Sequence, residues 1–412
     1  MNRKMKILII TVPEKGHVNP LIGTAQELVN QGAEIAFFAQ RDITDQLQKS
    51  GIECKCYTPG KNTPEFKLPD EFITNGEIFA QKVYDKMWLR RWIKTLLIDC
   101  AEGQKPGIES AIKEFCPDIL VCDPLSYAGA IVAEEHDMPW VGISNSLNPV
   151  VPDEWTCYLI ETLRIYDPDR KALFAKSKHD IKFKSSDVIS PYLNIVFTSE
   201  QYAPRSLSGN DFSHYVGAPF RLDNFRRGDE TDFPFHLINR QKKVVYMSLG
   251  SQLYYNPILF MTAYQALDGM NVQMILSVNE LCTDEFKKNF ADDTIICRYV
   301  PQLEILPYVD MMISHGGANS VIEAQTFGVP LALLPICNDQ HLQAQFMRRA
   351  NAGIVLDPRH PDVEVWRQAF KKLLDKNSEY YKNAQLIKED LRSLGGPKSA
   401  AELIVNLIKN DL

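Results

Sequence analysis

Short, unbroken apolar runs alternate along the chain with longer segments in which apolar residues recur at helical spacing. The first run, "KILIITV" (6–12), is typical of a parallel strand that is buried on both faces. Asn19 and Pro20 then predict a helix start, since asparagine suits the N-cap and proline the first helical position. Gly32 ends this helix, and "AEIAFFA" (33–39) predicts the next strand. The apolar stripe of the helix comprises Leu21, Ile22, Ala25, Leu28 and Val29.

The same alternation predicts a doubly wound α/β domain over residues 1–219. Its further strands are expected at 117–123, 139–144 and 194–199. Residues 220–242 are charged and lack clear periodicity, which is typical of a linker between domains. After the linker, apolar runs resume at 243–251, 272–278, 294–300, 310–317 and 330–336. A second α/β domain, 243–397, is therefore predicted, followed by a terminal helical segment, 398–412.

Length and charge narrow the classes of function. At 412 residues the chain is too long for one ordinary core, which agrees with the prediction of two domains. The net charge of −7 argues against nucleic acid as a partner, because neutralising phosphates needs a basic face. The nine cysteines form no CxxC pair and are expected to be reduced thiols, which favours the cytoplasm. The N-terminal apolar run is too short for a signal peptide or a membrane span.

The most informative motif is "ISHGGANSVIE" (313–323), in which a strand is expected to run through two glycines into a helix. Ligands of such sheets bind beyond the carboxyl ends of the strands. A helix start with His315, Asn319 and Ser320 as donors suits a diphosphate. The competing interpretation is a plain turn in which Ser320 and Glu323 form a capping box. Neither predicted domain contains GxGxxG, so a dinucleotide cofactor loses its main support.

Several pieces of the chain resemble the family 1 glycosyltransferases, the UDP-dependent enzymes of GT-B fold. The C-terminal pieces are "YVPQLEIL", "SHGGANSVIE", "GVP" and "PICNDQ", and the N-terminal piece is "GHVNP". Gly316 and Ala318 stand where the plant enzymes have Cys and Trp, so the likeness is closer to the bacterial branch, which acts on natural products. The resemblance implies two Rossmann-like domains that face each other across a cleft, with the last helix packed back on the first domain.

The resemblance also implies roles for the matching residues. Tyr299, in place of the family's usual tryptophan, stacks on the uracil ring, Gln302 lies beside the nucleoside, and Glu323 binds the ribose hydroxyls. His315, Asn319 and Ser320 match the residues that bind the pyrophosphate, and Gly317 lies in the same turn. Asp339 and Gln340 match the pair that holds the sugar hydroxyls. Ser251 is a further donor-binding candidate in the Gly-rich turn "SLGS". No cofactor is implied, since the UDP-sugar is a co-substrate.

His17 is expected to face the cleft, because it follows the first strand directly. An imidazole with a pKa near 6.5 can accept the proton of an attacking hydroxyl, which predicts His17 as general base. Such a base works best with a carboxylate on its far nitrogen. Asp123, at the end of the strand 117–123, can supply it and matches the family's catalytic aspartate, whereas Asp118 is expected at the wrong end of the sheet. Alternatively, His17 is a surface or hydrogen-bonded core residue and Asp123 is a helix N-cap.

The sequence contains no metal-binding constellation, and its Asp-x-Asp pair, Asp167 and Asp169, is expected in a turn. The segment 71–98 walls an apolar acceptor pocket or belongs to the core. Its large apolar side chains are Phe72, Phe79, Tyr84, Met87, Trp88 and Trp92. The basic residues beside the tryptophans, Arg90, Arg91 and Lys94, would also allow peripheral contact with a membrane.

The sequence therefore predicts an inverting glycosyltransferase. It would move a hexose from a UDP-sugar to a hydroxyl of a small lipophilic acceptor without a metal, and the resemblance favours glucose as the hexose. One alternative is a UDP-sugar epimerase of the same architecture, which needs no external acceptor. The other is a nonenzymatic protein that keeps the nucleotide-sugar site; such a protein has no need of His17 and Asp123 together.

Overall fold

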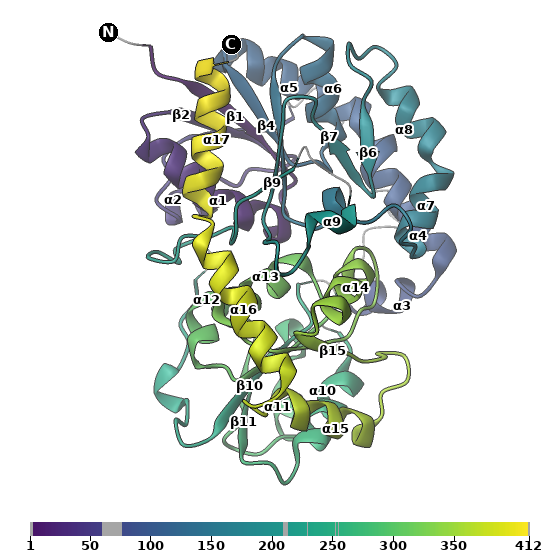
Figure 1. Ribbon diagram of the computed structural model, residues 1–412, viewed down its shortest axis with the longest axis vertical. Helices are drawn as coiled ribbons and strands as arrows, with labels where there is room; N and C mark the ends of the chain where they lie inside the picture. The colour runs from purple at the N-terminus through teal and green to yellow at the C-terminus, as the bar shows by residue number, and fades with distance from the viewer. Residues whose placement is uncertain are drawn as a thin grey trace.

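A computed structural model describes residues 3–59, 76–208, 213–228, 230–251, 253 and 255–410. It consists of two α/β domains stacked along the long axis of the molecule, each with helices on both faces of a parallel sheet (Figure 1). This confirms the predicted fold class. Because the strands of each sheet are parallel, their carboxyl ends, where ligands of such sheets bind, lie at one edge, and this edge faces the other domain.

The N-terminal sheet has seven strands in the order β3-β2-β1-β4-β5-β8-β9, and all of its pairings are parallel. Its strands are β1 (Lys6–Ile10), β2 (Glu34–Phe38), β3 (Lys55–Tyr57), β4 (Ile119–Cys122), β5 (Trp140–Ser144), β8 (Leu193–Val196) and β9 (Ser213–Tyr215). An antiparallel hairpin, β6 (Lys182–Lys184) and β7 (Asp187–Ile189), lies beside the sheet. The sequence did not predict β3, β9 or the hairpin, which are all short.

The helices of this domain connect the strands in a doubly wound order. They are α1 (Lys15–Asn30), α2 (Thr44–Lys49), α3 (Gly76–Lys82), α4 (Lys86–Lys94), the π-helical turn η2 (Thr95–Asp99), α5 (Ala101–Phe115), α6 (Tyr127–Glu135), η3 (Asn148–Val150), α7 (Tyr158–Ile165), α8 (Asp167–Leu173) and α9 (Arg205–Ser208). Asp167 and Asp169 stand in the first turn of α8 and not in a free turn, and Asp167 pairs with Arg170 at 3.1 Å.

Helix α1 begins earlier than the sequence predicts. The helix starts at Lys15 with Glu14 as N-cap, so the expected start at Asn19 is wrong, and Pro20 lies inside the helix. Val29, expected in the apolar stripe, is 43% exposed. His17 therefore lies in the first turn of α1, close to the carboxyl end of β1.

The C-terminal sheet has six parallel strands in the order β12-β11-β10-β13-β14-β15. Its strands are β10 (Lys243–Ser248), β11 (Val272–Ser277), β12 (Ile295–Cys297), β13 (Met311–Ser314), β14 (Leu331–Leu333) and β15 (Gly353–Val355). Its helices are α10 (Pro257–Leu267), η5 (Asn279–Leu281), α11 (Asp284–Lys287), α12 (Gln302–Ile305), η6 (Leu306–Tyr308), α13 (Ala318–Phe327), α14 (Gln340–Ala350), α15 (Val363–Leu373) and α16 (Glu379–Ser393). Ser248, Ser277 and Ser314 are in register, so the loops that follow them share one edge.

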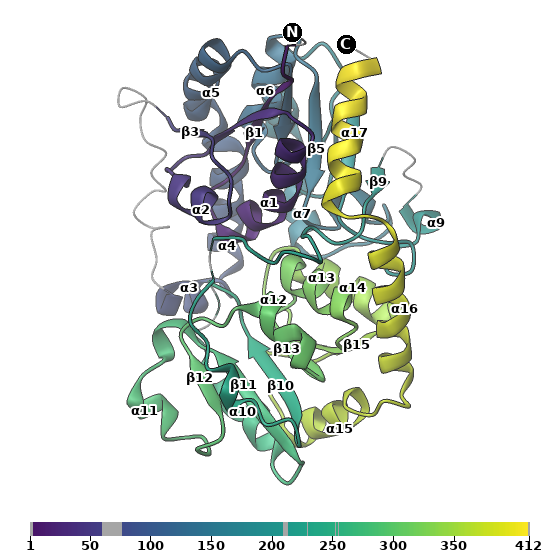
Figure 2. The same cartoon turned by 90° about the vertical axis from the view of Figure 1, so that its left-hand side faces the viewer.

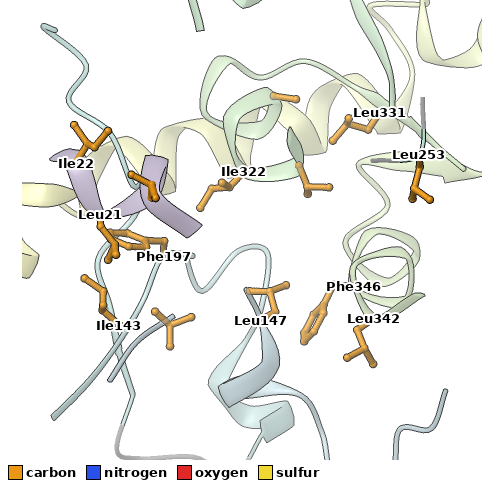
Figure 3. Close-up of a cluster of buried hydrophobic side chains, with 14 of the residues drawn as sticks. Leu21, Ile22, Ile143, Leu147, Phe197, Leu253, Ile322, Leu331, Leu342 and Phe346 are labelled. Carbon is orange, nitrogen blue, oxygen red and sulfur yellow. The ribbon is translucent and has the colours of Figure 1, made fainter. Parts of the chain in front are cut away.

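The last helix, α17 (Pro397–Asn410), leaves the C-terminal domain and lies along α1 of the N-terminal domain (Figure 2). The approach is close, because a Cβ at Gly23 of α1 would lie 2.7 Å from the Pro397 ring. Apolar side chains also meet between the domains, and Figure 3 shows Leu147 and Phe197 of the first domain in the same buried cluster as Ile322 and Phe346 of the second. The two domains therefore share a packed interface.

The charged segment 220–242 contains the short turn η4 (Phe235–Leu237) and is otherwise without helix or strand where it is described. It is nonetheless packed, because Phe220 stacks on Phe327 of α13 at a centroid distance of 6.2 Å and Phe225 meets the same ring edge-on. Within the described ranges, no helix is both long and apolar enough to cross a bilayer.

Candidate functional site

A cleft of about 910 Å³ lies between the two domains, where the loops after β1, β10 and β13 meet. Its wall contains most of the residues singled out in the sequence: His17, Ser251, Tyr299, Gln302, His315, Gly317, Asn319, Ser320, Glu323, Asp339 and Gln340. Asp123 stands behind His17. The structure thus brings the N-terminal histidine and the C-terminal motif, about three hundred residues apart in sequence, to one cavity.

His17 and Asp123 are neighbours because β1 and β4 are adjacent parallel strands. His17 lies in the first turn of α1 after β1, Asp123 follows β4 directly, and the two side chains meet at 2.6 Å between Nδ1 and Oδ2. The side chain of His17 is 22% exposed and that of Asp123 is 4% exposed. Asp118 lies at the opposite end of β4, where it accepts a hydrogen bond from the Lys6 backbone N–H at 2.7 Å.

The electrostatics of His17 differ from the sequence expectation. Burial by itself lowers the pKa of His17, but the charge and the hydrogen bond of Asp123 outweigh it, and with Glu14 and Asp339 they raise the pKa to about 9. The expected pKa near 6.5 is therefore wrong. The imidazole carries a proton at neutral pH, with Nδ1–H held by the carboxylate.

The second oxygen of Asp123 shapes the turn before α6. Its Oδ1 accepts from the Leu125 backbone N–H at 2.9 Å, while Ser126 and not Asp123 is the N-cap of the helix. The N-cap interpretation is thus wrong, although a local turn contact exists beside the contact with His17. Two hydrogen bonds fix the plane of the carboxylate, and that plane in turn fixes the imidazole.

Pro20 explains an unusual acceptor beside His17. In a regular helix the N–H of residue 20 would bond the carbonyl of Gly16, and proline has no N–H to give. The Gly16 carbonyl instead accepts from the Asn145 side chain of the N-terminal domain and from Asn319 Nδ2 of the C-terminal domain, the latter at 2.8 Å. One backbone oxygen thus joins both domains at the mouth of the cleft.

The motif after β13 places His315 between two glycines. A Cβ at Gly250 would lie 2.7 Å from its Cε1, and a Cβ at Gly317 would lie 2.6 Å from its Nε2. Burial lowers the pKa of His315 to about 4, so the ring is neutral at pH 7. Its Nδ1 has no hydrogen-bond partner among the residues that the structure describes.

Glu323 faces the cleft in a hydrogen-bonded cluster. Its Oε1 accepts from Arg227 Nη1 and its Oε2 from Gln302 Nε2, each at 2.6 Å. Helix α13 begins at Ala318, so Ser320 is already inside it and the capping-box interpretation is wrong. Gln302 Nε2 also lies 3.5 Å from Ser320 Oγ, which links the expected nucleoside and pyrophosphate contacts.

The remaining donor-site candidates occupy the rim and floor of the cleft. Lys15 of the N-terminal domain lies over the Tyr299 ring, with Nζ 4.2 Å from its centroid. Ser251 is exposed just after β10. Burial raises the pKa of Asp339 to about 6, and its own backbone hydrogen bond and the charge of His17 oppose the shift. Gln340 Oε1 accepts from the Ile336 and Cys337 backbone N–H groups and so closes the loop beneath.

The N-terminal wall of the cleft is apolar where the sequence suggested an acceptor pocket. Its apolar side chains are Phe79, Trp92, Ile93, Leu96, Leu97, Leu125 and Leu159. Trp88 is 4% exposed and packs edge-on against Phe79, so the core interpretation holds for this residue. Peripheral contact of Arg90, Arg91 and Lys94 with a membrane stays a prediction. Phe72 lies outside the described residues.

Lys15, Asn145 and Arg227 are among the polar residues of this cleft that sequence reasoning missed. Lys15 adjoins the N-terminal motif and could have been noticed there. Asn145 ends the strand β5 in the manner of Asp123 at β4, and this position was a usable signal. Arg227 stands in the charged segment 220–242, and no local pattern distinguishes it from its neighbours.

Comparison with known proteins gives matches over both domains. Residues 236–390 match the family model described as UDP-glucoronosyl and UDP-glucosyl transferase. The uncharacterized UDP-glucosyltransferase YdhE of Bacillus subtilis (strain 168) is 25% identical over 411 residues, which cover 98% of each chain. The solved glycotransferase of kitacinnamycin covers 98% of this chain with all of its own, at a TM-score of 0.76 and 20% identity. Spinosyn rhamnosyltransferase SpnG complexed with thymidine diphosphate has a TM-score of 0.72 and 17% identity, over 98% of this chain and 100% of its own.

Proposed function

We propose that the chain acts as a family 1 glycosyltransferase and moves a hexose, glucose first among candidates, from a UDP-sugar to a hydroxyl of a small lipophilic acceptor. The observation that carries this proposal is the shared cleft. The diphosphate-type turn before α13 and His17, which Asp123 holds from behind, open into the same cavity. The apolar wall around Trp92 suits a lipophilic acceptor.

In the proposed reaction, the helix start at α13 and the donors His315, Asn319 and Ser320 hold the diphosphate and stabilise its charge as it leaves. Asp339 and Gln340 hold the sugar hydroxyls. His17 Nε2 takes the proton of the acceptor hydroxyl as the oxygen attacks the anomeric carbon, and Asp123 stabilises the imidazolium that forms. Direct displacement at an α-linked donor gives a β-glycoside. The reducing conditions of the cytoplasm suit a chain whose nine cysteines are free thiols.

An acceptor-library screen with UDP-glucose, read by mass spectrometry, tests the proposed function. We expect a hexose added to one or more hydroxylated lipophilic compounds and UDP release that depends strictly on the acceptor. Release of UDP or conversion of the sugar without any acceptor would favour an epimerase. Binding of UDP-glucose with no transfer across the library would favour a nonenzymatic role.

A further inference from the structure

Arg227 is a buried cation in the wall of the cleft. It is 8% exposed, and it reaches Glu323 on α13, which is 3% exposed, at 2.6 Å. A charge-assisted bond between two buried groups is shorter and stronger than an ordinary hydrogen bond. The roles proposed above make no use of this guanidinium, although it lines the same cavity as the donor-site residues.

The two hydrogen bonds of Glu323 leave part of the acceptor capacity of its carboxylate unused. A carboxylate offers about four lone-pair sites, two on each oxygen. Arg227 uses one site on Oε1, and Gln302 uses one site on Oε2. One site per oxygen therefore remains for a ligand. Two hydroxyls on neighbouring carbons, as in ribose, match this remainder, and a deoxyribose can fill only half of it.

The main chain of Arg227 is anchored on the other domain. Its carbonyl accepts from Gln46 Nε2 of α2 at 3.4 Å, and Gln46 Nε2 also donates to Asn19 Oδ1 at 2.8 Å. The next residue, Gly228, has φ +77°, and a Cβ there would lie 2.2 Å from the Gln46 carbonyl oxygen. The segment is thus pressed against α2, and the guanidinium extends from this anchor to α13.

Resting on the proposed function, we propose that Arg227 is a positioning residue that sets the preference for a ribonucleoside diphosphate over its deoxy counterpart. It holds the Glu323 carboxylate in the orientation in which each oxygen accepts from one of two vicinal hydroxyls. Removing one partner of a buried ion pair leaves the other as an uncompensated buried charge. Without Arg227 the carboxylate turns away from the geometry that both hydroxyls need, and the discrimination falls.

Calorimetric titration of UDP and 2′-deoxy-UDP tests this proposal, because the two ligands differ only at the 2′-hydroxyl. The wild type is expected to bind UDP roughly tenfold to hundredfold more tightly, since one hydrogen bond to a charged group is lost in the deoxy ligand. In Arg227→Met and in Glu323→Gln the ratio is expected to fall to about threefold or less, and the double variant should fall no further. Arg226→Met, which removes an exposed cation of the same segment, should keep the wild-type ratio.

Arg227→Lys serves if the methionine variant does not fold. Lysine keeps the buried charge balanced, but a single ammonium does not fix the carboxylate plane as a guanidinium fork does. The ratio is therefore expected at least about threefold below that of the wild type. A wild-type ratio in a folded Met or Lys variant that still binds UDP and transfers hexose would overturn this role of Arg227 and leave the proposed function intact. Failure of the wild type both to bind UDP and to transfer hexose would overturn both.

Discussion

Asp123 holds His17 by a 2.6 Å contact between Oδ2 and Nδ1, and this contact joins the end of β4 to the first turn of α1. It leaves the opposite nitrogen, Nε2, for a ligand in the cleft. It also charges the imidazole, whose pKa is raised to about 9 although burial alone would lower it. A base with this pKa is a strong proton acceptor but is mostly protonated at pH 7.

The first prediction is therefore an alkaline pH profile. Because only the neutral imidazole accepts a proton, kcat/KM should rise with pH, reach half of its maximum near pH 9, the pKa of His17, and level off above it. Asp123→Asn removes the charge that raises this pKa, so its rising limb should move to lower pH while the plateau rate falls. Initial rates over a pH series, with thermal melts at each pH as the folding control, check this. An unmoved limb in the Asn variant would contradict the coupling of the two residues.

The second prediction concerns the nucleotide of the donor. If Glu323 binds both ribose hydroxyls as proposed, the enzyme should prefer a UDP-hexose to the deoxythymidine diphosphate sugar by ~1.5–3 kcal/mol. Calorimetry with the two donors measures this difference. Equal or tighter binding of the thymidine donor would contradict it. The comparison of the two donors separates this chain from SpnG, a protein of similar fold that was solved with thymidine diphosphate.

The third prediction rests on the close packing of Gly317 against His315. A Cβ at position 317 would lie 2.6 Å from Nε2 of the imidazole, so Gly317→Ala must displace the ring from the diphosphate turn. Overpacking of this kind costs roughly 1–3 kcal/mol, and the loss should appear in UDP affinity measured by calorimetry. Gly103→Ala is the control, since a Cβ in that part of α5 meets nothing within 4 Å. Unchanged UDP affinity in Gly317→Ala would remove His315 from the donor site.

The fourth prediction addresses the acceptor wall. Trp92 lines the cleft and stacks near Trp88, with ring centroids 6.3 Å apart. Trp92→Ala should weaken the acceptor by roughly 1–2 kcal/mol through lost apolar contact, which raises its KM and leaves UDP affinity unchanged. Met87→Ala on the same helix is the control, because Met87 is 63% exposed. An unchanged acceptor KM in the Trp92 variant would place the acceptor elsewhere.

Most of the fold could be predicted from the sequence, because a parallel strand buried on both faces reads as a continuous apolar run. Strands β1, β4 and β13 are of this kind. The edge strands β3 and β15 are harder to predict, because Lys55 interrupts the apolar pattern of the first and Gly353 begins the second. The start of α1 was misplaced because Asn19 and Pro20 carry helix-start signals. The helix tolerates Pro20, since the Gly16 carbonyl that proline cannot bond is taken by two asparagine side chains.

The residues of the candidate site also divide into those that the sequence could predict and those that it could not. Residues within one motif, such as His315 and Ser320, could be found because a short stretch of sequence carries them together. Arg227 could not, since its partner Glu323 is 96 positions away and its own segment has no periodicity. The pKa of His17 was also beyond reach, because it depends on how close Asp123 comes and how deeply both are buried.

Turnover by His17→Ala, with UDP-glucose and an alcohol acceptor identified in the screen, tests the central claim most directly. If His17 takes the acceptor's proton, kcat should fall by ~10²–10⁴-fold, while UDP-glucose affinity stays nearly the same because the other domain holds the donor. Adding Asp123→Asn should cost little more, since the two residues act as a unit. Wild-type turnover in His17→Ala, or losses that simply add in the double variant, would contradict the assignment of His17 as the base.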